Sequence, residues 1–531
     1  MSERARRFFE VAALCLILAL AAYLRLAKVV DNPGWYTDEG THLDITQNLL
    51  RGRVQYLAIN QSTLMFAKLP LFELLLAGLL GIFSGGINTL HTLALLRTLT
   101  GTLGVVSVGL LYWFARRTQR GRDPALALLA ALMLAIYPQA VVYSRFGFSY
   151  NLLAPLVLLA SLGCWEYLAA ARRRWLALAA SAIGLGGASD LWMFALVAPL
   201  ALVILKRNWR DLSWSLPLAL LPFGLYAAAM LATAPQAFLF DLNFTLARLS
   251  KLSLLAQLGT LATNYSTLLF QDAWIALGVV GLFLLRPVRL RRLSLLLFLL
   301  PILILGRTTA LYSLGFYYMI PLLPFIGLGV AALLRYGTPY VWQNINSAAA
   351  AIALDWYNPQ SRAILKSRSR LGNRAYLSAL LLFLIVAAPF AASLESTLRQ
   401  VSGGFTTPID PFLVDPHHAR PAAEFVNRHA ASDDVVIASP TLAWLIEANV
   451  ADVQMATVVA GYAAPDLPTN IPTGRFAFDP DYRRARFVVV DNLWHTWAVW
   501  NVPGARDVLR EVETWPLAFE AGEIKVYENP N

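Results

Sequence analysis

The chain has little charge and almost no cysteine. Only 14% of its 531 residues are Asp, Glu, Lys or Arg, whereas 58% are hydrophobic and the mean hydropathy is +0.56. This composition argues against a soluble enzyme and is typical of a multi-spanning membrane protein. The two cysteines, Cys15 and Cys164, lie in apolar runs without a CxxC pattern or histidine neighbours. Neither a disulfide framework nor a zinc site is therefore indicated.

The basic excess does not indicate nucleic-acid binding. The formal net charge is +11, but the Lys and Arg residues fall in short clusters between apolar runs. Such clusters are typical of the cytoplasmic loops of membrane proteins. The first apolar run continues from Arg7 to Leu24 without a small-residue cleavage site. We therefore expect a retained first span rather than a secretory signal.

The apolar runs predict about eleven membrane spans, and we detect no internal repeat. Several runs are shorter than the ~20 residues of a full span and need flanking residues to cross. The runs cover residues 8–27, 92–115, 125–143, 152–171, 175–188, 191–205, 214–232, 273–285, 293–306, 316–334 and 375–393.

The segment 69–84 decides how the chain threads the membrane. If this segment lies in the interface, every basic cluster falls on the cytoplasmic side, as the positive-inside bias requires. If it crosses, the clusters around Arg116 and Arg172 move outside. We therefore expect a multi-pass protein of the cytoplasmic (inner) membrane with a cytoplasmic N-terminus. The clusters are Arg4 to Arg7, Arg116 to Arg122, Arg172 to Arg174, Lys206 and Arg207, Arg286 to Arg292, and the segment 366–374.

The composition changes near residue 394, which predicts a transmembrane domain over 1–393 and a small extracytoplasmic α/β domain over 394–531. Alternating apolar residues predict strands at 434–439 and 486–491 and an edge or closing strand at 522–528, whereas 419–430 and 440–448 have helical spacing. The tryptophans between 494 and 500 are expected at the surface, resting on the membrane or binding an acceptor. No glycine-rich phosphate loop indicates a nucleotide.

Two adjacent carboxylates, Asp38 and Glu39, follow the first span on the expected outer side. One interpretation is helix capping, because Thr37 or Asp38 precedes an amphipathic segment and favours its N-terminal dipole. The other is catalytic, since a carboxylate held at the membrane surface near apolar walls suits a general base for an acceptor hydroxyl. Physical reasoning alone leaves the two interpretations equal.

The surrounding pattern resembles the membrane glycosyltransferases of the GT-C fold over roughly residues 8–335. It consists of the first span, Tyr36-x-Asp-Glu-Gly-x-His42, and Lys68-Leu-Pro70 opening an interfacial helix. The resemblance is strongest to the family 39 group, which includes protein O-mannosyltransferases and the lipid A aminoarabinose transferase. It extends to Tyr137-Pro138, Ser144-Arg145 and Phe316-Tyr317-Tyr318.

The resemblance implies an inverting transfer of a sugar from a polyprenyl-phosphate donor to a hydroxyl on a protein, lipid or glycan. Asp38 would act as the base, and Glu39 would orient the site or the loop. Lys68 would face the donor phosphate, although a lysine that anchors the interfacial helix is the alternative. Polyprenyl phosphate is already a good leaving group, so the site needs an activated acceptor and cations around the phosphate.

Other polar residues have two interpretations each. Arg145 and Arg307 contact the donor phosphate or anchor the ends of spans. Tyr317 and Tyr318 are substrate ligands or belt aromatics. His42 lies one helical turn after Asp38 and binds a sugar or a cation, or is structural. Asp190 is expensive to bury, so we expect it to reach the outer cavity or pair with a cation.

Two departures from the family pattern bear on activity. Ala67 stands where the aminoarabinose transferases carry an acidic metal ligand, so a divalent metal is compatible with the site but not indicated. Asn151 stands in a region where many relatives carry an acid. The alternative function is a non-catalytic GT-C-like subunit that serves as an interaction or assembly platform. A transporter is the weaker hypothesis, because few charges are found at mid-span. The outer segment 233–271 is expected to form amphipathic helices that gate acceptor entry.

Overall fold

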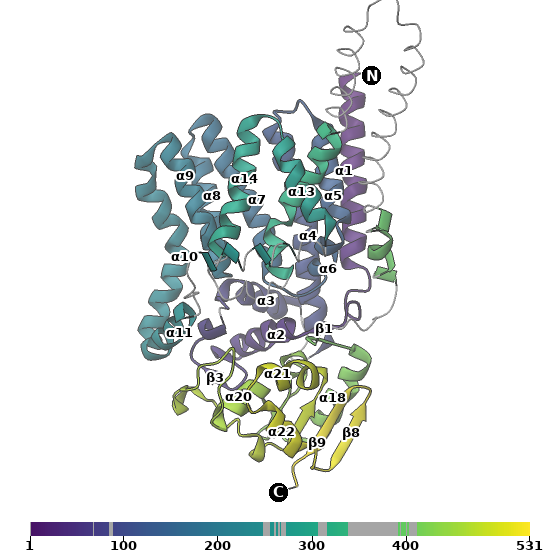
Figure 1. The fold of residues 1–531 in the computed structure, drawn as a ribbon, viewed down its shortest axis with the longest axis vertical. Coiled ribbons are helices and arrows are strands. Elements are labelled where there is room, and N and C mark those ends of the chain that lie inside the picture. Colours follow the sequence, from purple (N-terminus) through teal and green to yellow (C-terminus); the bar gives the residue numbers. More distant parts are fainter. Residues whose placement is uncertain are drawn as a thin grey trace, which may run out of the picture.

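The computed structural model describes residues 2–66, 68–83, 89–247, 272–305, 316–337 and 411–530, together with short stretches between 255 and 266 and between 391 and 402. Figure 1 shows three layers: an upright helical bundle, helices that lie across one end of it, and a C-terminal domain beyond these helices. The described part is mostly helical, and strands are concentrated in the C-terminal domain.

The bundle is built from apolar helices that match the predicted runs, with ends shifted by a few residues. Short 3₁₀ or π segments extend several of these helices at 191–196, 209–211, 316–322 and 333–337. The helices are α1 (Glu3–Leu26), α4 (Leu90–Thr118), α5 (Pro124–Ile136), α6 (Pro138–Ser144), α7 (Tyr150–Ala170), α8 (Arg173–Gly187), α9 (Val197–Arg207), α10 (Leu212–Thr233), α13 (Ala273–Leu284), α14 (Val288–Leu305) and α15 (Leu323–Ala332). Helix α11 (Pro235–Ala247) belongs instead to the predicted outer segment 233–271, most of which lies outside the described residues.

The long apolar helices show that the chain is a multi-pass membrane protein. Within the described ranges, five segments are long and apolar enough to cross a membrane, and the bent pair α5 and α6 raises the number to six. Pro138 opens α6 at a bend of 57°. The other predicted spans up to α14 correspond to helices that are too short to cross a membrane by themselves or not apolar enough, such as α8 and α13. Most of the predicted run 375–393 lies outside the described residues.

Basic clusters gather at the end of the bundle that lies away from the C-terminal domain. Arg116 at the end of α4 binds Glu10 of α1 at 2.6 Å, and Arg117 binds Glu166 of α7 at 2.7 Å. The side chain of Gln119 donates to the carbonyl of Arg286 in the α13–α14 connection. These contacts bring four separate helix ends to one level, as the predicted threading requires.

The crosswise layer follows the first span. It contains β1 (Trp35–Tyr36), α2 (Thr37–Leu50), the hairpin β2 (Gln55–Tyr56) and β3 (Ile59–Asn60), and α3 (Pro70–Phe83). Figure 1 shows α2 and α3 lying across the bundle end rather than along it. This arrangement agrees with the interfacial interpretation of 69–84.

The C-terminal domain is a mixed sheet with helices around it. The strand order is β6-β5-β7-β9-β8, in which β5 is parallel to β6 and β7, while β9 is antiparallel to β7 and β8. Its elements are β4 (Leu413–Val414), α18 (Pro416–His429), β5 (Val435–Ile437), α19 (Pro440–Ala443), β6 (Asn449–Ala451), α20 (Val453–Val459), β7 (Phe487–Val490), α21 (Val499–Asn501), α22 (Ala505–Val512), β8 (Leu517–Ala521) and β9 (Ile524–Glu528).

Three expectations for this domain need correction. The final strand β9 is not an edge strand, because β8 pairs with its outer side. The helix expected over 440–448 ends at Ala443, since the chain turns there into β6. Trp494 is fully buried, and Trp497 packs on Phe412 with ring centroids 5.5 Å apart, which leaves Trp500 as the exposed tryptophan of the three.

Candidate functional site

The N-terminal turn of α2 is capped by Glu39 rather than by Thr37 or Asp38. The Oε2 atom of Glu39 accepts the backbone N–H of Tyr36 at 3.0 Å, and its Oε1 accepts the backbone N–H of Gly147 at 2.7 Å. Arg97 of α4 binds both carboxylate oxygens at 2.6 and 2.7 Å. Glu39 is therefore buried and fully bonded. Its geometry supports the role of orienting the loop and leaves it no face for a reacting group.

Two buried arginines, Arg97 and Arg145, hold the connection between α1 and α2, and a third, Arg25, ties α1 to the end of α5. Arg97 also donates to the carbonyls of Val29, Val30, Pro33 and Gly34. Arg145 donates to the carbonyls of Leu24, Ala27, Lys28 and Asn32, and Arg25 to those of Ala21, Leu134 and Ala135. Arginine suits this role because its planar fork satisfies several carbonyls at once. For Arg145 the arrangement favours the anchoring alternative over donor-phosphate binding.

Asp38 points away from this network and toward Lys68. Its Oδ2 lies 3.9 Å from the Nζ of Lys68, and the two side chains are 33% and 12% exposed. Because Glu39 caps the helix, Asp38 has no capping duty and stays partly accessible at the first turn of α2. Lys68 stands two residues before Pro70, which opens α3. Asp38 on α2 and Lys68 just before α3, the expected base and phosphate ligand, thus face each other.

His42 forms a buried pair with Glu73 of α3. The Nδ1 of His42 lies 2.7 Å from Oε1 of Glu73, and both side chains are at most 2% exposed. Burial is the main cause that lowers the pKa of His42, with the Lys68 charge adding to it. The imidazole is therefore neutral near pH 7 and donates from Nδ1. Its Nε2 and the Oε2 of Glu73 have no hydrogen-bond partner within the described part of the chain.

Asp190 adds a third carboxyl beside Asp38 and Glu73. It caps the turn before α9 by accepting the N–H of Trp192 at 2.8 Å. Burial raises its pKa to about 6, while the nearby Lys68 charge opposes the rise. The expected ion pair of Asp190 with a cation is not formed among the described residues, although the Lys68 charge lies close enough to act on its pKa.

Aromatic side chains from the bundle border the Asp38 side of the site. The rings of Tyr317 and Tyr318 lie 4.5 Å apart, and each contacts the ring of Tyr150. Both tyrosines lie within electrostatic range of the Asp38 carboxylate. Tyr317 also packs on Phe148, so the two tyrosines belong to an aromatic cluster beside Asp38.

Asn151 fills a structural role in this chain. Its side-chain amide donates to the carbonyls of Tyr143, Phe146 and Phe148, which fixes the loop that carries Arg145. A carboxylate could not donate these bonds. Arg307 and Ala67 lie outside the described residues.

The C-terminal domain closes directly over α2. A Cβ atom on Gly40 would lie 1.7 Å from the carbonyl oxygen of Pro440 in α19, so only glycine permits the approach. Strand β1 pairs with β4, and the hydroxyls of Thr37 and Thr441 lie 3.2 Å apart. A second tie joins Asp241 of α11 to Arg475 at 2.9 Å, with both side chains buried. The candidate site is thus bordered by both parts of the protein.

The donor set does not point to a metal. Among the residues that the structure describes, no group of three or more His, Cys, Asp or Glu side chains fits a metal ion. The cluster instead offers an accessible carboxylate, a lysine and a neutral histidine, which suit proton abstraction and stabilisation of an anion.

Solved structures with the same fold are membrane glycosyltransferases. ArnT from Cupriavidus metallidurans in the apo state superposes with a TM-score of 0.59 at 15% identity and covers 99% of this chain and 98% of its own. The ArnT structure bound to undecaprenyl phosphate gives 0.55 at 14% identity, with the same coverage. The oligosaccharyltransferase AglB from Archaeoglobus fulgidus, in complex with an inhibitory peptide and a dolichol-phosphate, gives 0.51 at 12% identity over 93% of this chain and 71% of that one.

The comparisons support the GT-C fold but not the narrower family 39 assignment. The protein O-mannosyltransferase complex Pmt1–Pmt2 of S. cerevisiae matches at 21% identity over 41% of this chain and 33% of that one, with a TM-score of 0.34. No protein-family model and no curated protein matches the sequence. The chain therefore has the architecture of a GT-C membrane glycosyltransferase, at an identity that shows the fold alone.

Proposed function

We propose that the protein is an inverting glycosyltransferase that moves a sugar from a polyprenyl-phosphate donor to a hydroxyl acceptor on a protein, lipid or glycan. The observation that carries the proposal is the pairing of Asp38, in the first turn of α2, with Lys68, two residues before α3, at 3.9 Å. The whole-chain likeness to a polyprenyl-phosphate-bound structure supports the donor class.

Each side chain has a separate task in this proposal. Asp38 takes the proton from the acceptor hydroxyl as the oxygen attacks the anomeric carbon, and the bond from that carbon to the phosphate oxygen breaks. Lys68 stabilises the charge that develops on the departing polyprenyl phosphate. Glu39 and Arg97 are positioning residues, because their bonds fix the turn that presents Asp38.

The orientation in the membrane belongs to the same proposal. The positive-inside bias assigns the bundle end with Arg116 and Arg117 to the cytoplasm. The site and the C-terminal domain then lie on the extracytoplasmic face. In this orientation the transmembrane domain ends near residue 393 and the extracytoplasmic domain follows it.

The test is release of polyprenyl phosphate from a panel of polyprenyl-phosphate sugars by the purified chain in lipid nanodiscs, with native membrane extract as acceptor. Replacing Asp38 by Asn should lower the release rate by about 10²–10⁴-fold, the range of general-base contributions, while donor binding is retained. Asp31→Asn is the matched control, because Asp31 is an exposed carboxylate that pairs with Arg420 at 3.4 Å.

Two results would count against the proposal. Equal release by the Asp38→Asn variant and the wild type would remove Asp38 as the base. Absence of release from every donor, together with absence of donor binding, would favour the non-catalytic platform instead.

A further inference from the structure

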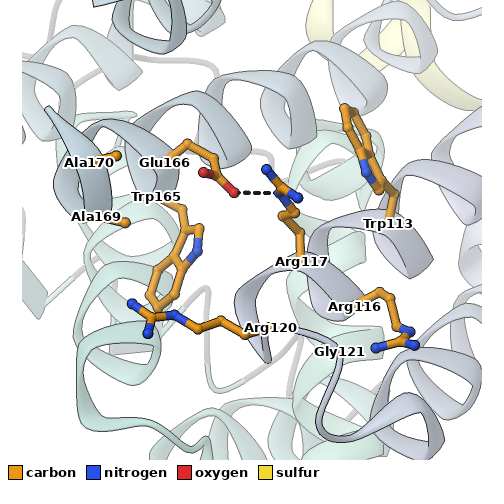
Figure 2. Close-up of a pocket in the computed structure, with 9 residues that line it drawn as sticks. All are labelled: Trp113, Arg116, Arg117, Arg120, Gly121, Trp165, Glu166, Ala169 and Ala170. Carbon is orange, nitrogen blue, oxygen red and sulfur yellow. Dashed lines mark hydrogen bonds and ion pairs between the residues drawn. The ribbon is translucent and has the colours of Figure 1, made fainter. Parts of the chain in front are cut away.

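A cavity of about 600 Å³ lies at the end of the bundle opposite the candidate site. It is bordered by the C-terminal end of α4, the turn that follows α4, and the last turns of α7 (Figure 2). Its volume is within the range of sites that hold small molecules. The cavity is remote from Asp38, because Asp38 belongs to α2, which lies in the crosswise layer at the other end of the bundle (Figure 1).

Arginines outnumber carboxylates around this cavity. Arg116 is balanced by Glu10 and Arg117 by Glu166, at 2.6 and 2.7 Å. Arg120 is exposed and has no ion pair to any carboxylate within the described residues. A cavity with three guanidinium groups and a single lining carboxylate therefore keeps a positive charge that suits an anion.

The aromatic walls locate the cavity at the level of lipid headgroups. Trp165 is buried in one wall, whereas Trp113 is 41% exposed. Val106, two turns before Trp113 on α4, is 43% exposed, so the same helix face continues toward the membrane interior as an apolar surface. Tryptophan beside clustered arginine is typical of the membrane interface, where an indole has one apolar and one polar side.

We propose that this cavity binds the phosphate headgroup of an anionic membrane phospholipid. Arg120 supplies the uncompensated charge to the phosphate, while the acyl chains lie along the α4 face that carries Val106 and Trp113. Basic cavities between membrane helices on the cytoplasmic side favour anionic headgroups for this reason. The bound lipid would brace α4 against α7, the two helices that the Arg117–Glu166 pair already joins.

The test measures lipid retained by the purified full-length chain in native mass spectrometry, after mixing with equal amounts of phosphatidylglycerol and phosphatidylcholine. Wild type should retain phosphatidylglycerol preferentially, and Arg120→Gln should lower that retention about fivefold, as expected for one basic residue near an anionic surface. Arg122→Gln is the matched control, because Arg122 is exposed, carries the same charge and does not line the cavity.

Three outcomes would overturn the inference. The first is unchanged phosphatidylglycerol retention by Arg120→Gln. The second is an equal loss in Arg122→Gln, which would show general attraction rather than a site. The third is displacement of the lipid by equimolar glycerol phosphate, which would show a site for a soluble phosphate. Because none of these measurements involves turnover, failure here is distinct from failure of the proposed glycosyltransferase activity.

Discussion

The Nδ1 of His42 lies 2.7 Å from Oε1 of Glu73, and this pair joins the two crosswise helices close to Asp38 and Lys68. The imidazole also packs edge-on against Phe72, with ring centroids 5.0 Å apart. Asp38 and His42 are one turn apart on α2, and Glu73 follows Lys68 closely along the chain, so the buried pair joins the two segments that carry the proposed functional groups.

Removing one partner of this pair should be more harmful than removing both. His42→Phe leaves the buried Glu73 carboxyl without its hydrogen-bond partner, which should lower the free energy of unfolding by about 1–3 kcal/mol. The double variant His42→Phe with Glu73→Leu should recover part of this loss, because no buried polar group is left unsatisfied. Thermal unfolding of the single and double variants measures the coupling. If the loss of unfolding free energy in the double variant equals the sum of the losses in the two single variants, the pairing of His42 with Glu73 is contradicted.

Lys68→Gln should weaken donor binding more than it affects folding. The variant removes the cation beside Asp38 while keeping a similar side-chain length. We expect a rise in the KM for the polyprenyl-phosphate sugar of about tenfold or more, which corresponds to a charge-assisted hydrogen bond of ~1.5–3 kcal/mol. Lys28→Gln serves as a control, since Lys28 is an exposed lysine in the α1–α2 connection. Unchanged values of both KM and kcat in the Lys68 variant would leave only the anchoring role.

The packing of the C-terminal domain against α2 should depend on Gly40. Replacing a helical glycine by alanine is normally stabilising by about 0.5–1 kcal/mol, but the added Cβ at Gly40 would meet the Pro440 carbonyl. We therefore expect Gly40→Ala to lower the free energy of unfolding by about 1–3 kcal/mol, as overpacking does. Thermal unfolding and limited proteolysis between the two parts provide the measurement.

Gly78→Ala gives the matched control for this change, because a Cβ at Gly78 on α3 meets nothing within 4 Å. That variant should be as stable as the wild type or more stable. Equal stability of the Gly40 and Gly78 variants would show that the C-terminal domain does not rest on α2 in solution.

Much of the bundle was predictable, because a helix that crosses a membrane needs a long run of apolar residues. The predicted runs 8–27 and 152–171 correspond to α1 and α7 with ends shifted by a few residues. The sheet order was not predictable, because β9 pairs with β7 across a long stretch of chain, whereas only its pairing with β8 is a local hairpin. The same holds for Ala443, where contacts of the folded domain end the helix early.

The site was predicted in part. Asp38 and Lys68 were singled out by their pattern, and the structure brings them together. The partner of Glu39 was missed, although Arg97 stands within a predicted span, where an ionisable residue is costly and should have a partner. The contact with Glu39 joins residues far apart in sequence, so only the fold reveals it. Glu73 was missed because it is a single acid in an otherwise apolar helix.

The pH dependence of donor binding should reflect the ionisation of the Asp190 carboxyl. Burial raises the pKa of this carboxyl to about 6, so it is charged above pH 6 and neutral below. A charged Asp190 near Lys68 opposes the approach of the donor, whose phosphodiester stays anionic throughout this range. The KM for donor should therefore fall as the pH is lowered through about 6. Asp190→Asn keeps an oxygen that accepts the Trp192 N–H. In this variant the KM for donor should stay at its low-pH value between pH 5 and pH 8. If the variant keeps the pH dependence of the wild type, another group titrates.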